Sequence, residues 1–220
     1  YLTGNYWGSD ARGELYNDDP RLGDARLCGT TASLCGIEAA EYEKDEEKLI
    51  RGIELDIMLH SFLLTLSGIP VLYSGDEVGM LNDYSYHEDP LKWDDSRYLH
   101  RGKFPWKEAA NRNKAKTRPG KIYKGIQRFL KLRQEHRVFD SGADTWIIPT
   151  GNDHVLGIGR FYQNEKLVAF FNFSHLPQLI YTGEEEVFKD AFSSKKAKLD
   201  RVELLPYGYV WYLKDYAPST

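Results

Sequence analysis

Apolar residues follow helical spacing in two parts of the chain. Between Lys44 and Leu66 they recur every three or four positions over most of the helix surface, which predicts a well-buried helix. A second helix is predicted from about Pro119 to His136. Between the two, Ile69–Tyr73 form a continuous apolar run bounded by glycines. Such a run predicts a short strand buried on both faces, because a half-exposed strand would alternate apolar and polar residues.

From Val138 onward the pattern changes to short strand-like runs separated by turn residues. These runs occupy residues 145–148, 155–162, 167–173, 178–181, 187–191, 198–204 and 209–213. Their hairpin-like spacing predicts an antiparallel β-sandwich. We therefore expect two domains, residues 1–137 with a helix–strand–helix pattern and residues 138–220 with an all-β fold.

The polar stretches predict irregular structure. Residues 1–24 and 80–118 lack periodicity, and a loop as long as the second is usually functional or disordered. The acidic segment Glu38–Glu47 is expected to be a solvated loop that leads into the first long helix. A short helix over residues 27–37 would place Cys28 and Cys35 about 10 Å apart along its axis, too far for a disulfide.

Composition excludes some partners and favours others. The formal net charge of −4 gives no electrostatic attraction to nucleic acid or to anionic membranes, so neither is expected as a partner. Aromatic residues make up 14% of the chain, including 15 Tyr and 5 Trp. Aromatic rings pack against the apolar face of a pyranose, although a well-filled β-domain core explains them equally well. No metal-ligand spacing or phosphate-binding loop is found, so no metal or cofactor is expected.

The residues around the predicted strand carry a family resemblance. Gly68–Glu77, which ends in Ser74-Gly75-Asp76-Glu77, resembles the eighth barrel strand and following turn of α-amylase-superfamily enzymes. The segments similar to the amylosucrase branch in particular are 78–83, 94–97, 100–101, 23–30 and 205–207. The resemblance implies an α+β fragment. It would hold the last helix–strand–helix of a (β/α)8 TIM barrel, starting in the loop after the seventh strand, followed by a β-sandwich C-terminal domain.

Retaining glycosidases need two carboxyl groups facing one anomeric carbon. The adjacent acids Asp76–Glu77 and Asp94–Asp95 are poor candidates, because neighbours along a chain rarely converge on one atom. In the superfamily, the reacting carboxylates come from the ends of earlier strands. We therefore expect no catalytic carboxylate in this chain, and interpret Asp76 and Glu77 as residues that brace their loop.

Two arginines are the candidate substrate-binding residues. The resemblance matches Arg97 to an arginine at the bottom of the amylosucrase pocket, which pairs with an upstream aspartate and bounds the glucosyl site. A planar guanidinium suits that role, but a surface salt bridge with Asp94 or Asp95 is the alternative. Arg26 matches an arginine on the acceptor side, with an ordinary residue at a helix N-terminus as the alternative.

The implied function is that of a C-terminal part of an amylosucrase-like retaining glycosidase or glucosyltransferase, inactive by itself. Its partners would be carbohydrate (sucrose or an α-glucan) and the remainder of the parent chain, and the unpaired strand could cause self-association. One alternative is an α-amylase or α-glucosidase that hydrolyses α-glucosidic bonds. The other is a non-catalytic carbohydrate-binding module, in which Ile69–Tyr73 would be paired inside a closed domain.

Overall fold

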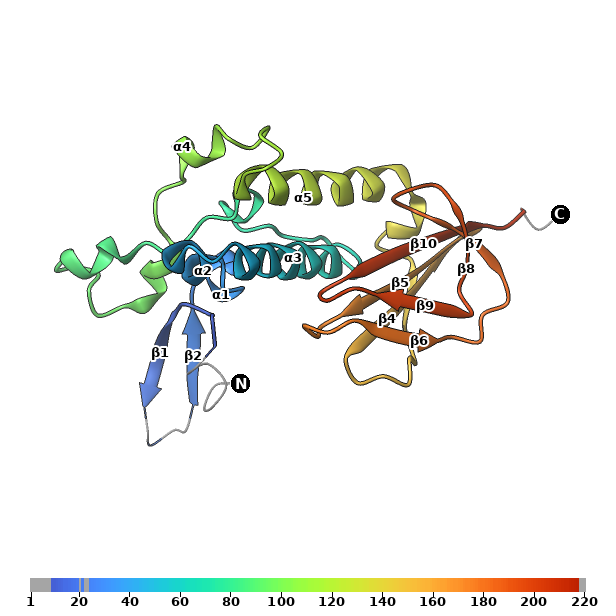
Figure 1. Cartoon of the computed structure of the whole chain (residues 1–220), viewed down its shortest axis with the longest axis horizontal. Coiled ribbons are helices and arrows are strands. Elements are labelled where there is room, and N and C mark those ends of the chain that lie inside the picture. The colour runs from blue at the N-terminus through green and yellow to red at the C-terminus, as the bar shows by residue number, and fades with distance from the viewer. Residues whose placement is uncertain (1–8, 20, 22–23, 218–220) are drawn as a thin grey trace. The chain divides into compact units, whose positions relative to one another are not determined.

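The computed structural model describes residues 9–19, 21 and 24–217, and their elements are shown in Figure 1. By contacts, the chain forms two compact units. Unit 1 comprises Tyr1–Asp56 and Leu72–Lys124, and unit 2 comprises Ile57–Val71 and Gly125–Thr220. The two long helices, α3 (Glu46–Leu63) and α5 (Arg118–Glu135), each begin in unit 1 and end in unit 2.

Unit 1 joins a β-hairpin to short helices. Its elements are β1 (Glu14–Asp19), β2 (Asp24–Cys28), α1 (Thr31–Leu34), α2 (Ile37–Glu43), η1 (Asp76–Val78), η2 (Tyr84–Glu88), η3 (Ser96–His100) and α4 (Trp106–Ala109). Thr30 caps α1 by accepting a hydrogen bond from the backbone of Ser33. The side chain of Asn82 ties the loop after η1 to the same region, because it accepts from Thr30 N at 2.8 Å and donates to Arg12 O at 2.9 Å.

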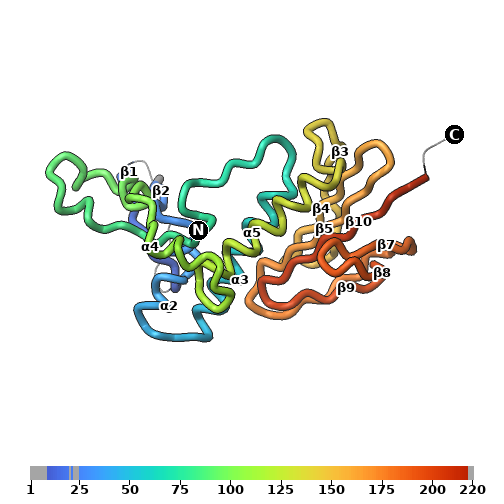
Figure 2. The backbone as a smooth tube through the Cα atoms, turned by 90° about the horizontal axis from the view of Figure 1, so that it is seen from above, coloured from blue at the N-terminus to red at the C-terminus, as the bar shows by residue number. Residues whose placement is uncertain are grey.

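Unit 2 is an antiparallel β-sandwich packed on helical segments. Its elements after α5 are η4 (Arg137–Phe139), β3 (Asp144–Ile148), β4 (Val155–Tyr162), β5 (Glu165–Asn172), β6 (Gln178–Tyr181), β7 (Val187–Asp190), β8 (Lys196–Lys198), β9 (Arg201–Leu204) and β10 (Tyr209–Asp215). Six strands form one sheet in the order β3-β4-β5-β10-β7-β8, and β6 pairs with β9 in a second sheet. The strands of the larger sheet are labelled along the backbone in Figure 2.

The larger sheet of unit 2 buries both of its faces. On one face Val168 and Phe170 pack with Ile180 and Val202 of the smaller sheet, which forms the sandwich core. On the other face the fully buried Trp211 lies 5.3 Å, centroid to centroid, from Phe129 of α5. Burial of these large side chains is the main stabilising contribution to this unit.

Two arginines bind the carbonyl groups of Leu64 and Thr65, which directly follow α3. Arg160 of β4 is fully buried and donates to the carbonyls of Thr65 (3.0 Å), Val138 (2.9 Å) and Asp140 (2.9 Å). Arg133 of α5 donates to the carbonyl of Leu64 at 2.7 Å. Cations at a helix C-terminus are favoured by the helix dipole, so these contacts join α3 to the β-domain within unit 2.

The strand expected at Ile69–Tyr73 is not formed, and this expectation is wrong. The segment runs without strand assignment between α3 and η1, with Ile69 exposed to 89% and Val71 to 78%. A strand buried on both faces needs a hydrogen-bonded neighbour on each side, and the described part of the chain places none beside this segment. The apolar pattern is that of a buried strand, but its partners are missing.

Other expectations for unit 1 also need correction. Within residues 1–24, the part that the structure describes contains β1 and the start of β2 instead of irregular chain. Most of the acidic segment Glu38–Glu47 is helical, because Ile37, Ala39 and Ala40 bury one side of α2. The helix expected over residues 27–37 is interrupted, and Cys28 and Cys35 are buried free thiols, on β2 and after α1 respectively.

Candidate functional site

The candidate substrate-binding site is built on the β1–β2 hairpin. The two strands are antiparallel, and Tyr16 of β1 is directly opposite Arg26 of β2. Opposite residues of an antiparallel pair project from the same face, with Cβ atoms about 5 Å apart. Arg26 is exposed and is paired across the hairpin with Tyr16. Its place on a strand corrects the alternative that it begins a helix.

The second arginine reaches the same tyrosine from η3. Asp95 precedes η3, and its carboxylate accepts from the backbone of Arg97 at 3.0 Å. The same carboxylate accepts from the guanidinium Nε at 2.8 Å and Nη2 at 2.7 Å. This fork leaves 43% of the Arg97 side chain exposed and places its Cζ 4.5 Å from the Tyr16 ring centroid. The structure thus places Arg97 at the ring of Tyr16, the residue opposite Arg26 in the hairpin.

The ion pair determines the protonation of both partners. Its hydrogen bonds lower the pKa of Asp95 to about 2, because protonation would break the fork. The same bonds raise the pKa of Arg97 above its usual value. Asp95 is therefore ionised at neutral pH and fixes the direction of the Arg97 guanidinium. The pair with Asp95 is the contact named in the surface salt-bridge alternative, and the role of Arg97 in substrate binding stays a prediction.

A second set of contacts fastens the hairpin to residues 84–100. Tyr86 donates to one carboxylate oxygen of Glu14, and His87 Nε2 lies 2.8 Å from the other. The Tyr86 and His87 rings are stacked with centroids 4.2 Å apart. Burial, followed by the hydrogen bond to Glu14, raises the pKa of Tyr86 well above its ordinary range, so the phenol stays a donor. Ser96 Oγ also donates to Leu15 O at 3.0 Å. These contacts hold residues 84–100 against the β1–β2 hairpin.

The acids after the apolar segment brace their turn. Glu77 accepts a hydrogen bond from the backbone of Gly75 at 2.8 Å, as the sequence predicted. Gly75 itself has φ +105°, and a Cβ there would lie 2.7 Å from Met80 Sδ. Only glycine fits this turn. Asp94 is exposed, and its neighbour Asp95 forms an ion pair with Arg97.

Arg118 holds the turn after η1 in place. It is buried and donates to Gly79 O at 2.7 Å, forms an ion pair with Glu41 at 3.2 Å and binds Glu108. One side chain therefore joins α2, the turn after η1, and α4. Across the described ranges of the chain, no cluster of three or more His, Cys, Asp or Glu side chains could hold a metal ion.

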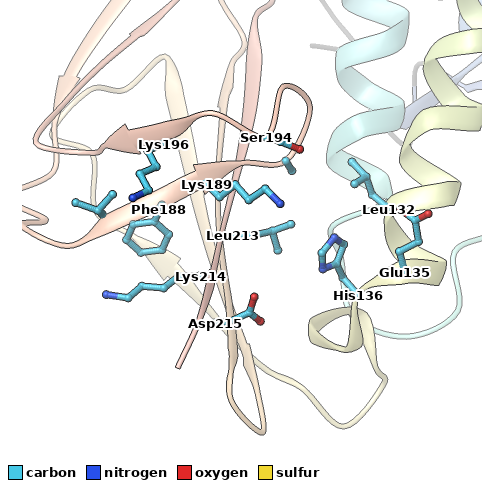
Figure 3. A pocket seen from close by; sticks show the side chains of 12 residues that line it. Leu132, Glu135, His136, Phe188, Lys189, Ser194, Lys196, Leu213, Lys214 and Asp215 are labelled. Atoms are coloured by element: carbon cyan, nitrogen blue, oxygen red, sulfur yellow. The ribbon is translucent and has the colours of Figure 1, made fainter. Parts of the chain in front are cut away.

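Unit 2 contains a groove of about 650 Å³ between the C-terminal end of α5 and strands β7 and β10 (Figure 3). Leu132 and Leu213 line its apolar part, and Glu135 and Lys189 extend into it from opposite walls. Phe188, the aromatic residue among its lining groups, is only 2% exposed. The groove offers mixed charges but no open ring face, so it lacks the features of a sugar-binding site.

Comparison with known proteins finds enzymes of carbohydrate metabolism with similar sequences. Over 141 residues, or 55% of the chain, it is 28% identical to trehalose synthase of Thermus thermophilus. Over 170 residues, or 72% of the chain, it is 27% identical to alpha-amylase 3 of Dictyoglomus thermophilum. These matches cover 14% and 34% of the two enzymes, so the chain spans about a third of their length or less. No family model matches the chain.

Solved structures agree with the sequence relatives. Trehalulose synthase MutB from Pseudomonas mesoacidophila MX-45 matches with a TM-score of 0.55 and 18% identity, over 73% of this chain and 38% of MutB. AmyP in complex with maltose matches with a TM-score of 0.58 and 14% identity, over 77% of this chain and 36% of AmyP. At these identities the likeness shows a shared fold.

The α-amylase-family resemblance inferred from the sequence is thereby confirmed at the level of the superfamily. The fold class is confirmed too: the chain is an α+β fragment with antiparallel sheets, and it matches the C-terminal portion of these enzymes. The boundary between residues 137 and 138 and the roles of Arg97 and Arg26 stay predictions. Tyr16, which contacts Arg97 and is paired with Arg26 in the hairpin, was missed, because a tyrosine in a polar segment gives no periodic signal.

Proposed function

We propose that the chain is the C-terminal part of an α-glucan- or sucrose-active retaining glycosidase or glucosyltransferase similar to amylosucrase. The observation that carries the proposal is the family resemblance, since its relatives include a trehalose synthase, an alpha-amylase and a cyclomaltodextrinase. Neighbouring structures hold glucose, maltose or maltotriose, which supports carbohydrate as the partner. In the parent, residues 1–137 would complete a (β/α)8 barrel and residues 138–220 would form the C-terminal domain.

In this proposal Arg97 bounds the glucosyl site and Arg26 lies on the acceptor side. Asp95 occupies Nε and Nη2 of Arg97, and within the described residues Nη1 has no hydrogen-bond partner. That amino group is therefore available to sugar hydroxyls while Asp95 fixes its direction. The Tyr16 ring has Arg97 over one face, and the rest of its surface could pack against a pyranose.

The reaction needs two carboxylates, and the family resemblance assigns both to earlier strands of the barrel. A retaining mechanism uses a nucleophile and an acid/base about 5 Å apart on either side of the anomeric carbon. We assign both to the remainder of the parent, so the 220-residue chain alone should release no sugar from sucrose or maltooligosaccharides. Turnover clearly above a blank, abolished by Asp76→Asn or Asp94→Asn, would contradict this assignment.

The role of Arg97 is tested in the parent enzyme. Arg97→Ala removes a charge-assisted contact to substrate, for which a loss of about 2 kcal/mol or more is typical. The value of kcat/KM should therefore fall roughly 30-fold or more. Arg97→Lys should recover little, because an ammonium cannot reproduce the fork. Arg112→Ala is the matched control, since Arg112 is exposed and binds only the backbone of Ala109 in the described chain. Equal rates for the Arg97 and Arg112 variants would reduce Arg97 to a surface salt bridge.

A hydrolase acting on α-glucans is the second candidate. It is favoured by the alpha-amylase relative, which matches 72% of the chain. Hydrolysis and glucosyl transfer differ in whether water or a sugar reaches the glucosyl-enzyme. Product analysis of the parent with sucrose and with maltooligosaccharides distinguishes them, because transfer lengthens an acceptor glucan and hydrolysis only shortens it.

A further inference from the structure

An exposed tryptophan lies in a trough at the edge of the larger sheet of unit 2. Trp146 is on the edge strand β3, opposite Gly159 of β4. A Cβ built on Gly159 would lie 2.1 Å from Cε2 of the indole, so the ring rests directly on the backbone there. Trp146 nevertheless keeps 39% of its surface exposed. A glycine inside a strand weakens the strand and often marks a close approach of another group.

A second glycine of β4 also allows close packing on the same face. Gly157 is opposite Ile148 of β3 and next to Phe170, whose ring would lie 3.0 Å from a Cβ at that position. Gly157 and Gly159 are two residues apart, so both face the sandwich interior. A cavity of about 120 Å³ lies beside Trp146. The cavity is lined by Trp146, Ile148, Lys166, Val168, Phe170, Thr182, Glu184 and Leu199.

The cavity has an apolar floor and a polar rim. Lys166 Nζ lies 3.2 Å from Glu184 Oε2 and 3.8 Å from Glu186 Oε2. Glu184 N donates to Thr182 Oγ1 at 3.1 Å, which orders the loop that carries the carboxylate. An ammonium group has three donors and a carboxylate about four acceptor positions, so the ion pair keeps free capacity for hydroxyl groups.

This arrangement selects a neutral, amphipathic ring. A charged ligand gains little, since two lysines, Lys166 and Lys214, already pair with the two glutamates. A purely apolar ligand would desolvate the ion pair without compensation. A pyranose has an apolar face for the indole and hydroxyls for the rim. The larger groove of Figure 3 lacks an exposed ring and so does not combine these features.

We propose that the Trp146 cavity is a carbohydrate-binding site that holds one glucosyl unit of an α-1,4-glucan, apart from the candidate site at Arg97. The choice of a pyranose rests on the cavity, whereas the choice of an α-glucan rests on the proposed function. A glucan held there would stay attached to the β-domain between successive reactions. The effective concentration of its other glucosyl units near the enzyme would rise as a result.

Titration of the 220-residue chain with maltoheptaose, followed by calorimetry, tests this site. We expect saturable binding that Trp146→Ala weakens about tenfold or more. Trp106→Ala is the matched control, because Trp106 is also exposed but lies on α4, and should leave the affinity unchanged. Glu184→Ala probes the rim without disturbing the trough and should weaken binding severalfold. Its control, Glu185→Ala, changes an exposed neighbour that does not line the cavity.

Three results would overturn the proposal: no binding of maltoheptaose, equal binding by the wild-type chain and by both the Trp146 and Glu184 variants, or tighter binding of cellohexaose than of maltoheptaose. Failure of this site is distinguishable from failure of the proposed function. In the parent, Trp146→Ala should leave kcat for sucrose or maltose unchanged and raise KM only for long glucans. A parent without activity on any α-glucoside would refute the proposed function whatever the chain binds.

Discussion

Replacing Arg160 by methionine should destabilise unit 2 strongly. The guanidinium is fully buried and faces backbone carbonyls, without a hydrogen-bonded carboxylate. Burial is the main cause that lowers its pKa from the ordinary value, and the nearby Arg133 adds to the effect. Arginine nevertheless remains protonated in proteins. Methionine fills a similar volume but donates no hydrogen bond, so the carbonyls of Thr65 and Val138 would be left buried and unpaired.

The magnitude follows from these two buried acceptors. Each unsatisfied buried carbonyl costs about 1–3 kcal/mol, while removal of a buried charge returns part of its desolvation cost. The carbonyl of Asp140 is partly accessible and can turn to water. The expected loss in the free energy of unfolding is therefore about 2–4 kcal/mol. At roughly 4 °C per kcal/mol for a domain of this size, Tm should fall by about 8–16 °C.

Urea unfolding measured by tryptophan fluorescence gives the test, since Trp211 is buried in the same unit and should report its exposure. Arg160→Lys should recover about half of the loss, because an ammonium reaches fewer of the carbonyls. Arg137→Met is the control: this arginine is exposed and donates to Gln163, so the change should stay within about 0.5 kcal/mol. If Arg160→Met unfolds within that same margin, water reaches the carbonyls and the reasoning fails.

Two further predictions concern exposed apolar chain and pH. The 220-residue chain should self-associate through the exposed Ile69 and Val71. The double variant Ile69→Ser, Val71→Ser should shift the sedimentation profile towards monomer. A wild-type chain that sediments as a monomer at all concentrations would contradict this. Burial, followed by the nearby Arg101, lowers the pKa of His100 below 6.5, so below that pH the unfolded state binds the proton more readily. Stability should therefore fall as the pH drops through about 6.5, and His100→Gln should flatten that dependence in urea titrations at pH 7.5 and 5.5.

Elements with a complete local pattern were predicted well from the sequence. The bounds of β4 (Val155–Tyr162) coincide with the predicted run, and α5 differs from its prediction by one residue at each end. In both cases turn or capping residues flank a clear hydrophobic pattern, so the local sequence determines the element and its bounds. The run from residue 198 to 204 divides instead into β8 and β9, which pair in different sheets.

Elements that depend on distant partners were not predictable in this way. The β1–β2 hairpin has few apolar residues and is stabilised by contacts such as Glu14 with Tyr86, 72 positions away. The Ile69–Tyr73 segment shows the opposite case: its pattern predicts a strand, but the described part of the chain offers no neighbour and no strand forms. Strand pairing needs two segments, so the pattern of one segment alone cannot show whether a strand will form.

The candidate site was predicted only in part. Arg97 and Arg26 came from the family resemblance, whereas the ring of Tyr16 that Arg97 contacts did not. Arg160 gave a detectable signal that was not used: a charged residue within an otherwise apolar strand indicates a buried hydrogen-bonding role. The trough under Trp146 is marked by two glycines in one strand, a pattern that becomes informative only when β3 is placed beside β4.

The three-way anchor at Arg118 has an evolutionary consequence. Its cation faces Glu41 from α2 and Glu108 from α4, so loss of the arginine alone would leave two acids near each other and a free carbonyl at Gly79. Lineages that replace Arg118 should therefore replace both glutamates as well, and those that keep it should keep at least one. These three positions would then covary among related sequences even though they lie on separate elements.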